Sequence, residues 1–531
     1  MTLKRLFLIL VTFVVLVLVG LSLIASWRQP QIQSRLELYQ TNLLLHAAEW
    51  QGETADSDNL KPAREALVGA EPLKAAQKQY EQALNSAQTN LQKAKAQFEA
   101  QQKSETTLPP KPELPLKVAP STRTSISRSQ QPLQVSINQL ENLINELDLR
   151  IGILQAKQGQ TDAAVKKWTG VIERSKVQTK AESIAKTAGI LVGLWSSPPR
   201  LLPDAERWIN QQLDGWFRYQ GLAQLYQLQQ REEALSQLQA QEEAVAEQAV
   251  IKLAIVGAVP TIGFLIGVGL LIFIIGQRWV KGKESLLAQN EDVRWATPWN
   301  AETIWQVFVL GFFLMGQILV PLALSLLNLH PSSFNVRGQS LYILASYVLV
   351  ALGGLLVLYL SIKSFLPLPA QEKWFRFDVQ GNWFWWGFGG YLVALPLVII
   401  VSLVNQLIWK GQGGSNPLLS LALESQDGVA LLVFFSTAAI AAPLFEEFLF
   451  RGFLLPSLTR YLPVWGAIVA SSLLFAVAHL SLSEVLPLTT LGIVLGIVYT
   501  RSRNLLAPMF LHGLWNSGTL LSLFILGSGA R

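Results

Sequence analysis

Three short polar signatures interrupt the apolar stretches in roughly the last hundred residues of the chain. Each contains two residues spaced four apart, which places both on one face of a helix. Together the signatures contain Glu446, Glu447, Arg451, Phe475, His479, His512 and Asn516. A charged group at the centre of a bilayer costs about 2.5 to 3.5 kcal/mol on insertion scales, so ionisable residues inside apolar segments are functional candidates by default.

The side chains in these signatures are suited to activating a water molecule in an apolar cavity. Glu446 is the predicted catalytic base. The imidazoles of His479 and His512 and the amide of Asn516 are predicted to orient the water and the developing oxyanion. Hydrolysis is the reaction class that follows from this set.

The second glutamate has a different predicted role. Glu447 and Arg451 stand at positions i and i+4, close enough to form an ion pair along one helix face. Glu446 points about 100° away around the helix and stays free for chemistry. We therefore expect Glu447 and Arg451 to support the site without touching substrate, and Phe475 to pack against His479.

Spacing along the chain also predicts depth in the membrane. Glu446 and His479 are both about 16 residues from a turn at residues 462–463, so they should face each other at one depth. His512 is only about nine residues from the loop at 501–503. Either the helices tilt, or the first hairpin protrudes by roughly 10 Å.

The same residues also suit a metal ion. Two imidazoles and one carboxylate form a zinc site with an open position for water, so Glu446, His479 and His512 are an alternative ligand set for Zn²⁺. The short zinc-protease motif HExxH is absent, since none of the four histidines precedes a glutamate. No GxSG or GxGD protease signature is present, and no organic cofactor is expected.

Three other interpretations use these residues without proteolysis. A buried ion-pair network would tie the helices together, although it leaves Glu446 and the histidines without partners of opposite charge. A proton relay in a transporter would be favoured by internal repeats, which the membrane region lacks. In a membrane-anchored scaffold or assembly factor, the protease-like core would not be catalytic.

Composition places the signatures in a membrane protein. Half of the 531 residues are hydrophobic and 15% are charged, against roughly 25% in an ordinary soluble domain. The absence of cysteine excludes disulfides, thiolate zinc sites and a cysteine nucleophile. The net charge of +6 is scattered between apolar runs, so the expected partner is a lipid bilayer and not nucleic acid.

Nine apolar stretches are candidates for membrane helices, which makes the predicted fold an all-α polytopic membrane protein. They cover residues 6–26, 253–275, 303–327, 341–362, 384–408, 429–450, 465–482, 485–499 and 505–526. The first follows Lys4 and Arg5, and we interpret residues 1–26 as a signal anchor. Basic residues concentrate in alternate loops, which predicts a cytoplasmic amino terminus. The Gln- and Trp-rich composition without cysteine favours a bacterial plasma membrane or a thylakoid membrane. Residues 251–428 then hold further transmembrane helices.

A polar region separates the first span from the others, and the charge pattern makes it an extracytoplasmic helical domain. Residues 27–105 are predicted to be helical, with a stripe that suits a coiled coil. Residues 106–132 are rich in Pro, Ser and Thr and should form a linker. Residues 133–250 are again helical, and their segments 154–164 and 225–235 align as in tetratricopeptide-type helix pairs, with a generic bundle as the alternative.

Taken together, the three signatures resemble the three motifs of the CPBP family, the CAAX-prenyl-protease-like and bacteriocin-processing intramembrane proteases also called the Abi family. The resemblance covers roughly residues 429–526 and implies endopeptidase activity on protein or peptide substrates in the membrane. It implies catalytic roles for Glu446, His479, His512 and Asn516, with Glu447 and Arg451 in support. Family members have been described as metalloproteases and as enzymes with a metal-free, glutamate-activated water. The long helical region before the core departs from the family pattern, and a protein partner is expected for it.

Overall fold

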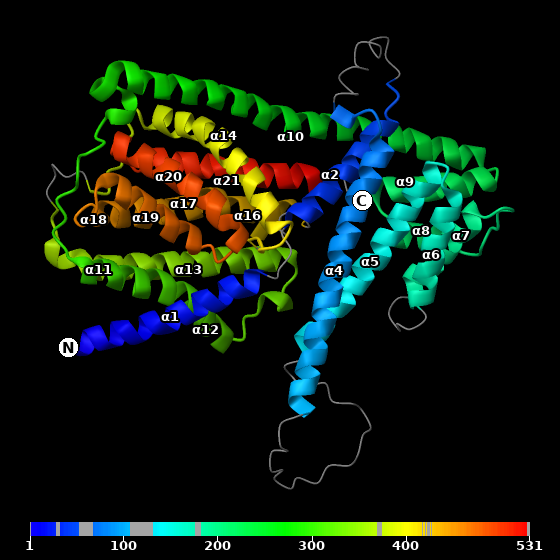
Figure 1. Ribbon diagram of the computed structural model, residues 1–531, viewed down its shortest axis with the longest axis horizontal. Coiled ribbons are helices and arrows are strands. Elements are labelled where there is room, and N and C mark those ends of the chain that lie inside the picture. Colours follow the sequence, from blue (N-terminus) through cyan, green and yellow to red (C-terminus); the bar gives the residue numbers. More distant parts are fainter. Residues whose placement is uncertain are drawn as a thin grey trace, which may run out of the picture. The chain divides into compact units, whose positions relative to one another are not determined.

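The computed structural model describes the chain in the segments drawn as coloured ribbons in Figure 1. The described residues are 2–27, 32–52, 67–106, 131–175, 182–368, 374–416, 418, 419, 421, 425 and 427–527. All regular elements within these segments are helices, as the sequence predicts. Most of the predicted linker at 106–132 lies outside the described residues. The chain divides into two compact units, which we call the helical domain (chiefly Glu37–Leu253) and the membrane unit (Met1–Leu36 and Ala254–Ser528).

The helices of the helical domain bury a shared apolar core. They are α2 (Ile32–Glu49), α4 (Pro72–Thr106), α5 (Gln131–Lys157), α6 (Thr161–Ser175), α7 (Glu182–Trp195), α8 (Ala205–Gln212), α9 (Gly215–Leu228) and the first part of α10 (Glu232–Lys281). Trp168 of α6 is fully buried, and its indole nitrogen donates to the Leu149 carbonyl at 3.1 Å. A Cβ atom on Gly152 would lie 2.2 Å from the Trp168 ring nitrogen. The close approach of α5 and α6 therefore requires glycine at this position.

The two similar sequence segments of the helical domain form the same turn. Segment 154–164 leads from α5 into α6, and segment 225–235 leads from α9 into α10. Gly159 and Gln230, at equivalent positions, both have a left-handed backbone, with φ of +79° and +54°. In each turn, the residue that follows the left-handed one donates its backbone N–H to the carbonyl oxygen five residues earlier. The distance is 2.9 Å in the first turn and 3.0 Å in the second. This is the Schellman pattern of a helix end, and the assignment to tetratricopeptide pairs stays a prediction.

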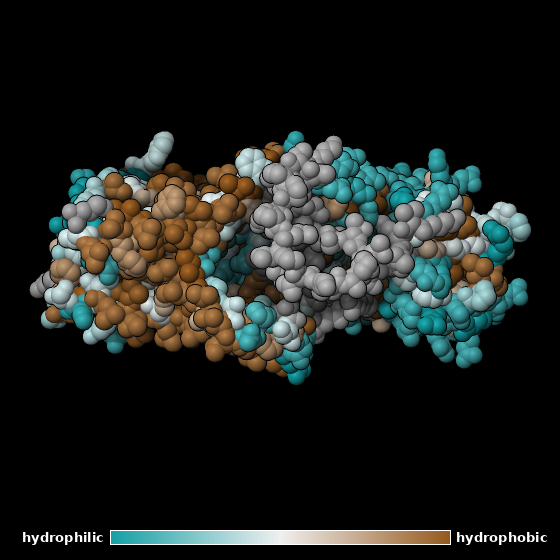
Figure 2. Space-filling model, turned by 90° about the horizontal axis from the view of Figure 1, so that it is seen from below, coloured by the Kyte–Doolittle hydropathy of each residue, from teal (hydrophilic) through white to brown (hydrophobic). Residues whose placement is uncertain are grey.

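The membrane unit contains the long apolar helices, and eight helices among the described residues are long and apolar enough to cross a bilayer. They are α1 (Leu3–Trp27), α10, the rod α11–η3–α12 (Ala301–Leu326), α13 (Val336–Ile362), α14 (Trp383–Trp409), the rod α16–α18 (Gly428–Leu458), α20 (Val485–Ser502) and α21 (Leu506–Gly527). Figure 2 shows hydrophobic side chains gathered over this unit and hydrophilic ones over the helical domain. The chain is a multi-pass integral membrane protein.

One predicted span, at 465–482, forms a shorter helix than expected. Its helix α19 (Val464–Val477) has 14 residues, about 21 Å in length against about 30 Å of hydrocarbon. The helix gives way to a turn in which Leu480 has a left-handed φ of +58°. The polar residues that follow bond the backbone carbonyls of a loop at 413–414 and form η9 (Leu482–Glu484). After Val477 the chain therefore bonds the distant loop and does not continue as an α-helix.

Helix α1 is packed into the membrane unit at both of its ends. Near its start, the Arg5 side chain pairs with Glu302 at 2.9 Å. Near its end, the Ser26 hydroxyl accepts the backbone N–H of Leu482 at 3.2 Å. Because Leu482 begins η9, the end of α1 contacts the turn that follows α19.

Candidate active site

The two adjacent glutamates lie on a rod in which α-helix and π-helix alternate. The rod consists of α16 (Gly428–Ser436), η7 (Thr437–Ala441), α17 (Ala442–Glu447), η8 (Phe448–Leu454) and α18 (Leu455–Leu458). Pro443 in the first turn of α17 has no N–H to give to the helical ladder. The amide of Ala442 bonds the Thr437 carbonyl five residues back, which is the π pattern. The Ala438 carbonyl, the normal α-helical acceptor for residue 442, is therefore available to another partner.

Asn516 of α21 takes this carbonyl. Its side-chain nitrogen donates to the Ala438 oxygen at 2.7 Å. The contact ties α21 to the rod one helical turn before α17 begins. The observed partner of Asn516 is thus backbone, and its predicted role in orienting water stays a prediction.

Glu447 is the centre of a buried charged network. Its Oε1 atom is 2.7 Å from Arg451 Nη1 and 2.8 Å from His512 Nδ1. The Glu447 and Arg451 side chains have no exposed surface. The guanidinium also donates to the Gly492 carbonyl at 3.1 Å and lies 4.6 Å from the centre of the Phe475 ring. The predicted pair at i and i+4 is confirmed, and it connects the rod to α20 and α21.

The contacts of the two histidines determine which ring nitrogen carries a proton. His479 Nδ1 is 2.8 Å from the Phe475 carbonyl, and His512 Nδ1 contacts the Glu447 carboxylate. Carbonyl and carboxylate oxygens accept hydrogen bonds, so each Nδ1 is the donor. In the neutral imidazole each Nε2 then has a lone pair for a water proton or a cation. The Phe475 ring packs edge-on against both imidazoles, with ring centres 4.8 and 5.7 Å apart.

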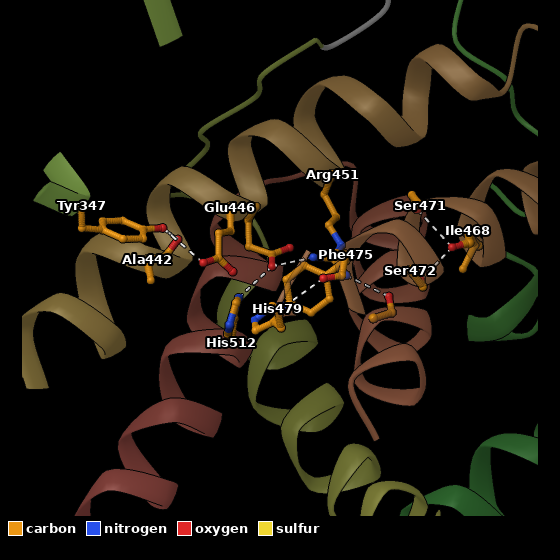
Figure 3. Close-up of polar contacts among 12 residues, drawn as sticks. Tyr347, Ala442, Glu446, Arg451, Ile468, Ser471, Ser472, Phe475, His479 and His512 are labelled. Atoms are coloured by element: carbon orange, nitrogen blue, oxygen red, sulfur yellow. Dashed lines mark hydrogen bonds and ion pairs between the residues drawn. The ribbon is translucent and has the colours of Figure 1, made fainter. Parts of the chain in front are cut away.

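Glu446 has different surroundings from Glu447. Its Oε1 atom accepts from the Tyr347 hydroxyl of α13 at 3.2 Å, and its Oε2 atom is buried with no partner among the described residues. Glu447 Oε2 is also unpaired, but that carboxylate already binds a guanidinium and an imidazole. Figure 3 shows the Tyr347 hydroxyl pointing towards the Glu446 carboxylate. Within the described part of the chain, Glu446 is thus a half-buried side chain whose carboxylate is held by one neutral donor and whose Oε2 atom is buried.

The depths of the helices agree with the predicted protrusion of one hairpin. Leu505, directly before α21, lies against Gly452 of the rod, where a Cβ atom would be 3.2 Å from Leu505 Cδ1. The rod continues beyond this point to Leu458, about 9 Å further at 1.5 Å per residue. The α18–α19 hairpin therefore extends past the α20–α21 loop. This offset brings His512, early in α21, level with Glu447.

Several contacts of the site were not predicted from the sequence. They involve Tyr347 and the backbone carbonyls of Ala438 and Gly492. Backbone carbonyls carry no sequence signal, because every residue has one. A signal for Tyr347 was present in the stripe that it forms with Ala351 and Leu358 at positions i, i+4 and i+11, which faces the core.

The two histidines have one feature of metal ligands. A histidine that donates its Nδ1 proton to a carboxylate or carbonyl presents Nε2 in the way that metal-binding histidines do. Among the described residues, however, no three His, Asp or Glu side chains form a cluster that would hold a metal ion. The set of Glu446, His479 and His512 as zinc ligands stays a prediction.

The fold and the site together define a class: a polytopic helical membrane protein with glutamates, histidines and an amide gathered between its last spans. The family model of the Type II CAAX prenyl endopeptidase Rce1-like proteins matches residues 428–518. All residues of the three sequence signatures fall within this match. The chain therefore carries a membrane-peptidase segment of the Rce1-like CAAX protease (CPBP) family, as the signatures predict.

Two curated relatives are similar to this part of the chain. The putative membrane peptidase YdiL of Bacillus subtilis (strain 168) is 25% identical over 132 residues, which cover 25% of this chain and 53% of the relative. The membrane-embedded CAAX protease MroQ of Staphylococcus aureus (strain USA300) is 25% identical over 191 residues, which cover 35% of this chain and 74% of the relative. The chain thus spans about half the length of the first relative. No solved structure matches the chain.

Proposed function

We propose that this protein is an intramembrane endopeptidase that hydrolyses peptide bonds of membrane-associated proteins or peptides. The family match supports hydrolysis of protein substrates. The observation that carries the proposal is Glu446 itself, a carboxylate inside an apolar rod with a buried oxygen that has no partner among the described residues. Such a group is costly for stability and is suited to accept a proton from water.

The proposed reaction uses the groups around Glu446 in one order. A water beside Glu446 Oε2 attacks the carbonyl carbon of the scissile peptide bond and gives a proton to this oxygen. The second hydrogen of this water is donated to the Nε2 lone pair of His479 or His512, which orients the water. The second amide hydrogen of Asn516, which the Ala438 carbonyl leaves free, stabilises the oxyanion. The proton on Glu446 then passes to the leaving amine as the carbon–nitrogen bond breaks.

The test compares newly formed amino termini in membranes that contain wild-type protein or Glu446→Gln. The substitution preserves shape and removes the base, so we expect the wild-type termini to be lost, with a rate decrease of at least about a hundredfold. Glu302→Gln, which alters a pair at the edge of the membrane unit, is the control and should leave the termini unchanged. A metal chelator in parallel decides whether Zn²⁺ takes part. Retained cleavage by Glu446→Gln would refute the proposal and favour the scaffold alternative.

We also propose that the amino terminus is cytoplasmic and that the helical domain is extracytoplasmic, in a bacterial plasma membrane or a thylakoid membrane. Arg278 and Lys281 in the last turn of α10 support this orientation, because basic residues flank spans on the cytoplasmic side. The cysteine-free chain allows single-cysteine labelling. An impermeant maleimide on intact cells should label Ser86→Cys in α4, and should label Lys283→Cys only after permeabilisation. The reverse pattern would overturn the orientation.

A further inference from the structure

A residue outside the family match contacts the proposed base. Tyr347 lies on α13, well before residues 428–518, and its hydroxyl is 3.2 Å from Glu446 Oε1. The same hydroxyl is 3.5 Å from the Ala442 carbonyl. Both neighbours are acceptors and the hydroxyl has one proton, so the proton is donated to the nearer and charged carboxylate. Figure 3 shows the ring extending from α13 towards Glu446 and Ala442.

The packing of α13 brings this hydroxyl to the rod. Gly354 lies two turns after Tyr347 on the same face of α13. A Cβ atom at Gly354 would be 2.8 Å from the Gly311 carbonyl and 3.0 Å from the Phe445 ring, so the helices approach closely because residue 354 is glycine. The Tyr347 ring also packs edge-on against Phe445, with ring centres 6.1 Å apart. Tyr347 therefore reaches Glu446 from a packed helix and not from a loop.

We propose that Tyr347 is a positioning residue that selects which oxygen of Glu446 acts as the base. The hydroxyl binds Oε1 and thereby fixes the rotation of the carboxylate. Oε2, which is buried and without a partner among the described residues, is then the oxygen that takes the proton from water. Tyr347 itself neither touches the substrate nor exchanges a proton. The inference rests on the proposed hydrolytic function and explains why a helix outside the family match belongs to the site.

The first experiment measures kcat and KM of full-length Tyr347→Phe on a membrane peptide that carries a cleavage site found with the wild type. A hydrogen bond to a charged group contributes enough that its loss should lower kcat about ten- to a hundredfold. KM should stay within about twofold, because the hydroxyl does not contact the substrate. Tyr359→Phe, on the same helix but 56% exposed, is the matched control and should behave as wild type. Wild-type kcat in Tyr347→Phe, or an equal loss in Tyr359→Phe, would overturn the inference.

A double-mutant cycle separates positioning from a merely structural effect. Glu446→Asp shortens the side chain and withdraws its carboxylate from the Tyr347 hydroxyl. If Tyr347 acts through Glu446, adding Tyr347→Phe should change the residual kcat of Glu446→Asp by less than about twofold. The same ten- to hundredfold loss in both backgrounds would show that Tyr347 acts elsewhere. If the wild-type protein cleaves nothing, the proposed function is refuted, and this inference with it. If the wild type cleaves but the Tyr347 variants give one of the contrary results above, the inference alone is refuted.

Discussion

The helical domain and the membrane unit each bury a histidine against a glutamate. His46 Nδ1 is 2.6 Å from Glu242 Oε1, and His512 Nδ1 is 2.8 Å from Glu447 Oε1. All four side chains are more than nine-tenths buried. The distance and burial of such a pair therefore do not distinguish a candidate active site from a tie between helices.

The surroundings of the two pairs do distinguish them. The Glu447 carboxylate also binds the Arg451 guanidinium, and the preceding residue of the rod supplies a second carboxylate, Glu446, whose Oε2 is unpaired among the described residues. In the helical domain the His46 Nε2 atom is buried without a described partner. A second carboxylate with one unpaired oxygen is therefore the feature that distinguishes the candidate site, while a buried His–Glu pair is common to both regions.

The largest effect is expected when the membrane pair is broken. Arg451→Met keeps the length and the apolar contacts of the side chain but leaves Glu447 buried without its cation. We expect the free energy of unfolding to fall by about 3 to 5 kcal/mol. Denaturant and thermal unfolding of the purified full-length protein in detergent measure this loss.

An exposed ion pair supplies the control for this variant. Arg5 is 58% exposed where it pairs with Glu302, so Glu302→Gln should cost only about 0 to 1 kcal/mol. If both substitutions cost equally little, the Glu447 network does not hold the helices in register. The additional contact of Glu447 with Arg451 would then not distinguish the membrane pair from the His46–Glu242 pair of the helical domain.

How much of the site the sequence predicts depends on how many helices a contact involves. Helical spacing predicts the Glu447–Arg451 pair, because one helix positions both partners. It does not predict the bond between Asn516 and the Ala438 carbonyl, which exists because the π turn at η7 releases that carbonyl. It also does not predict the reach of Tyr347 to Glu446, which depends on packing between two helices.

The fold shows the same division between local and distant determinants. Hydropathy predicts the long spans, since a run of about 20 apolar residues suits a bilayer wherever the rest of the chain lies. It overestimates α19, because the polar residues after Val477 bond a distant loop at 413–414. Hydropathy also does not predict the contact at the end of α1, where the Ser26 hydroxyl accepts the backbone N–H of Leu482. These features depend on residues far apart in the chain, which periodicity does not relate.

A smaller effect, of opposite sign in the two regions, is expected at two helical glycines. A Cβ atom on Gly492 of α20 would lie 2.8 Å from Ser472 Cβ, whereas one on Gly189 of α7 would meet nothing within 4 Å. Gly492→Ala should therefore lower the free energy of unfolding by about 1 to 3 kcal/mol through overpacking. Gly189→Ala should raise it by about 0.5 to 1 kcal/mol, since alanine favours a helix. Unfolding curves of both variants test this, and a shift of the same sign in both would contradict the packing argument.

The smallest effect is expected in the pH dependence of the helical domain. Burial raises the pKa of the Glu242 carboxyl, and the bond to His46 offsets only part of this increase. The contribution of Glu242 to stability is therefore complete below its unfolded-state pKa of about 4.5 and is lost as the pH rises through the higher folded-state value. Glu242→Gln removes this titration, while the nearby Glu49 and Arg218 remain in both proteins.

Wild-type protein should accordingly lose stability relative to Glu242→Gln as the pH is raised from about 4.5 towards neutrality. Tryptophan fluorescence during denaturant unfolding measures the difference, because Trp216 of the same domain is fully buried and donates to Glu49 at 2.8 Å. A difference that is constant with pH would show that Glu242 gains as much from His46 as it loses by burial. The argument from the burial of Glu242 would then be wrong, and the unpaired Oε2 atom of Glu446 would remain the feature that sets the membrane site apart.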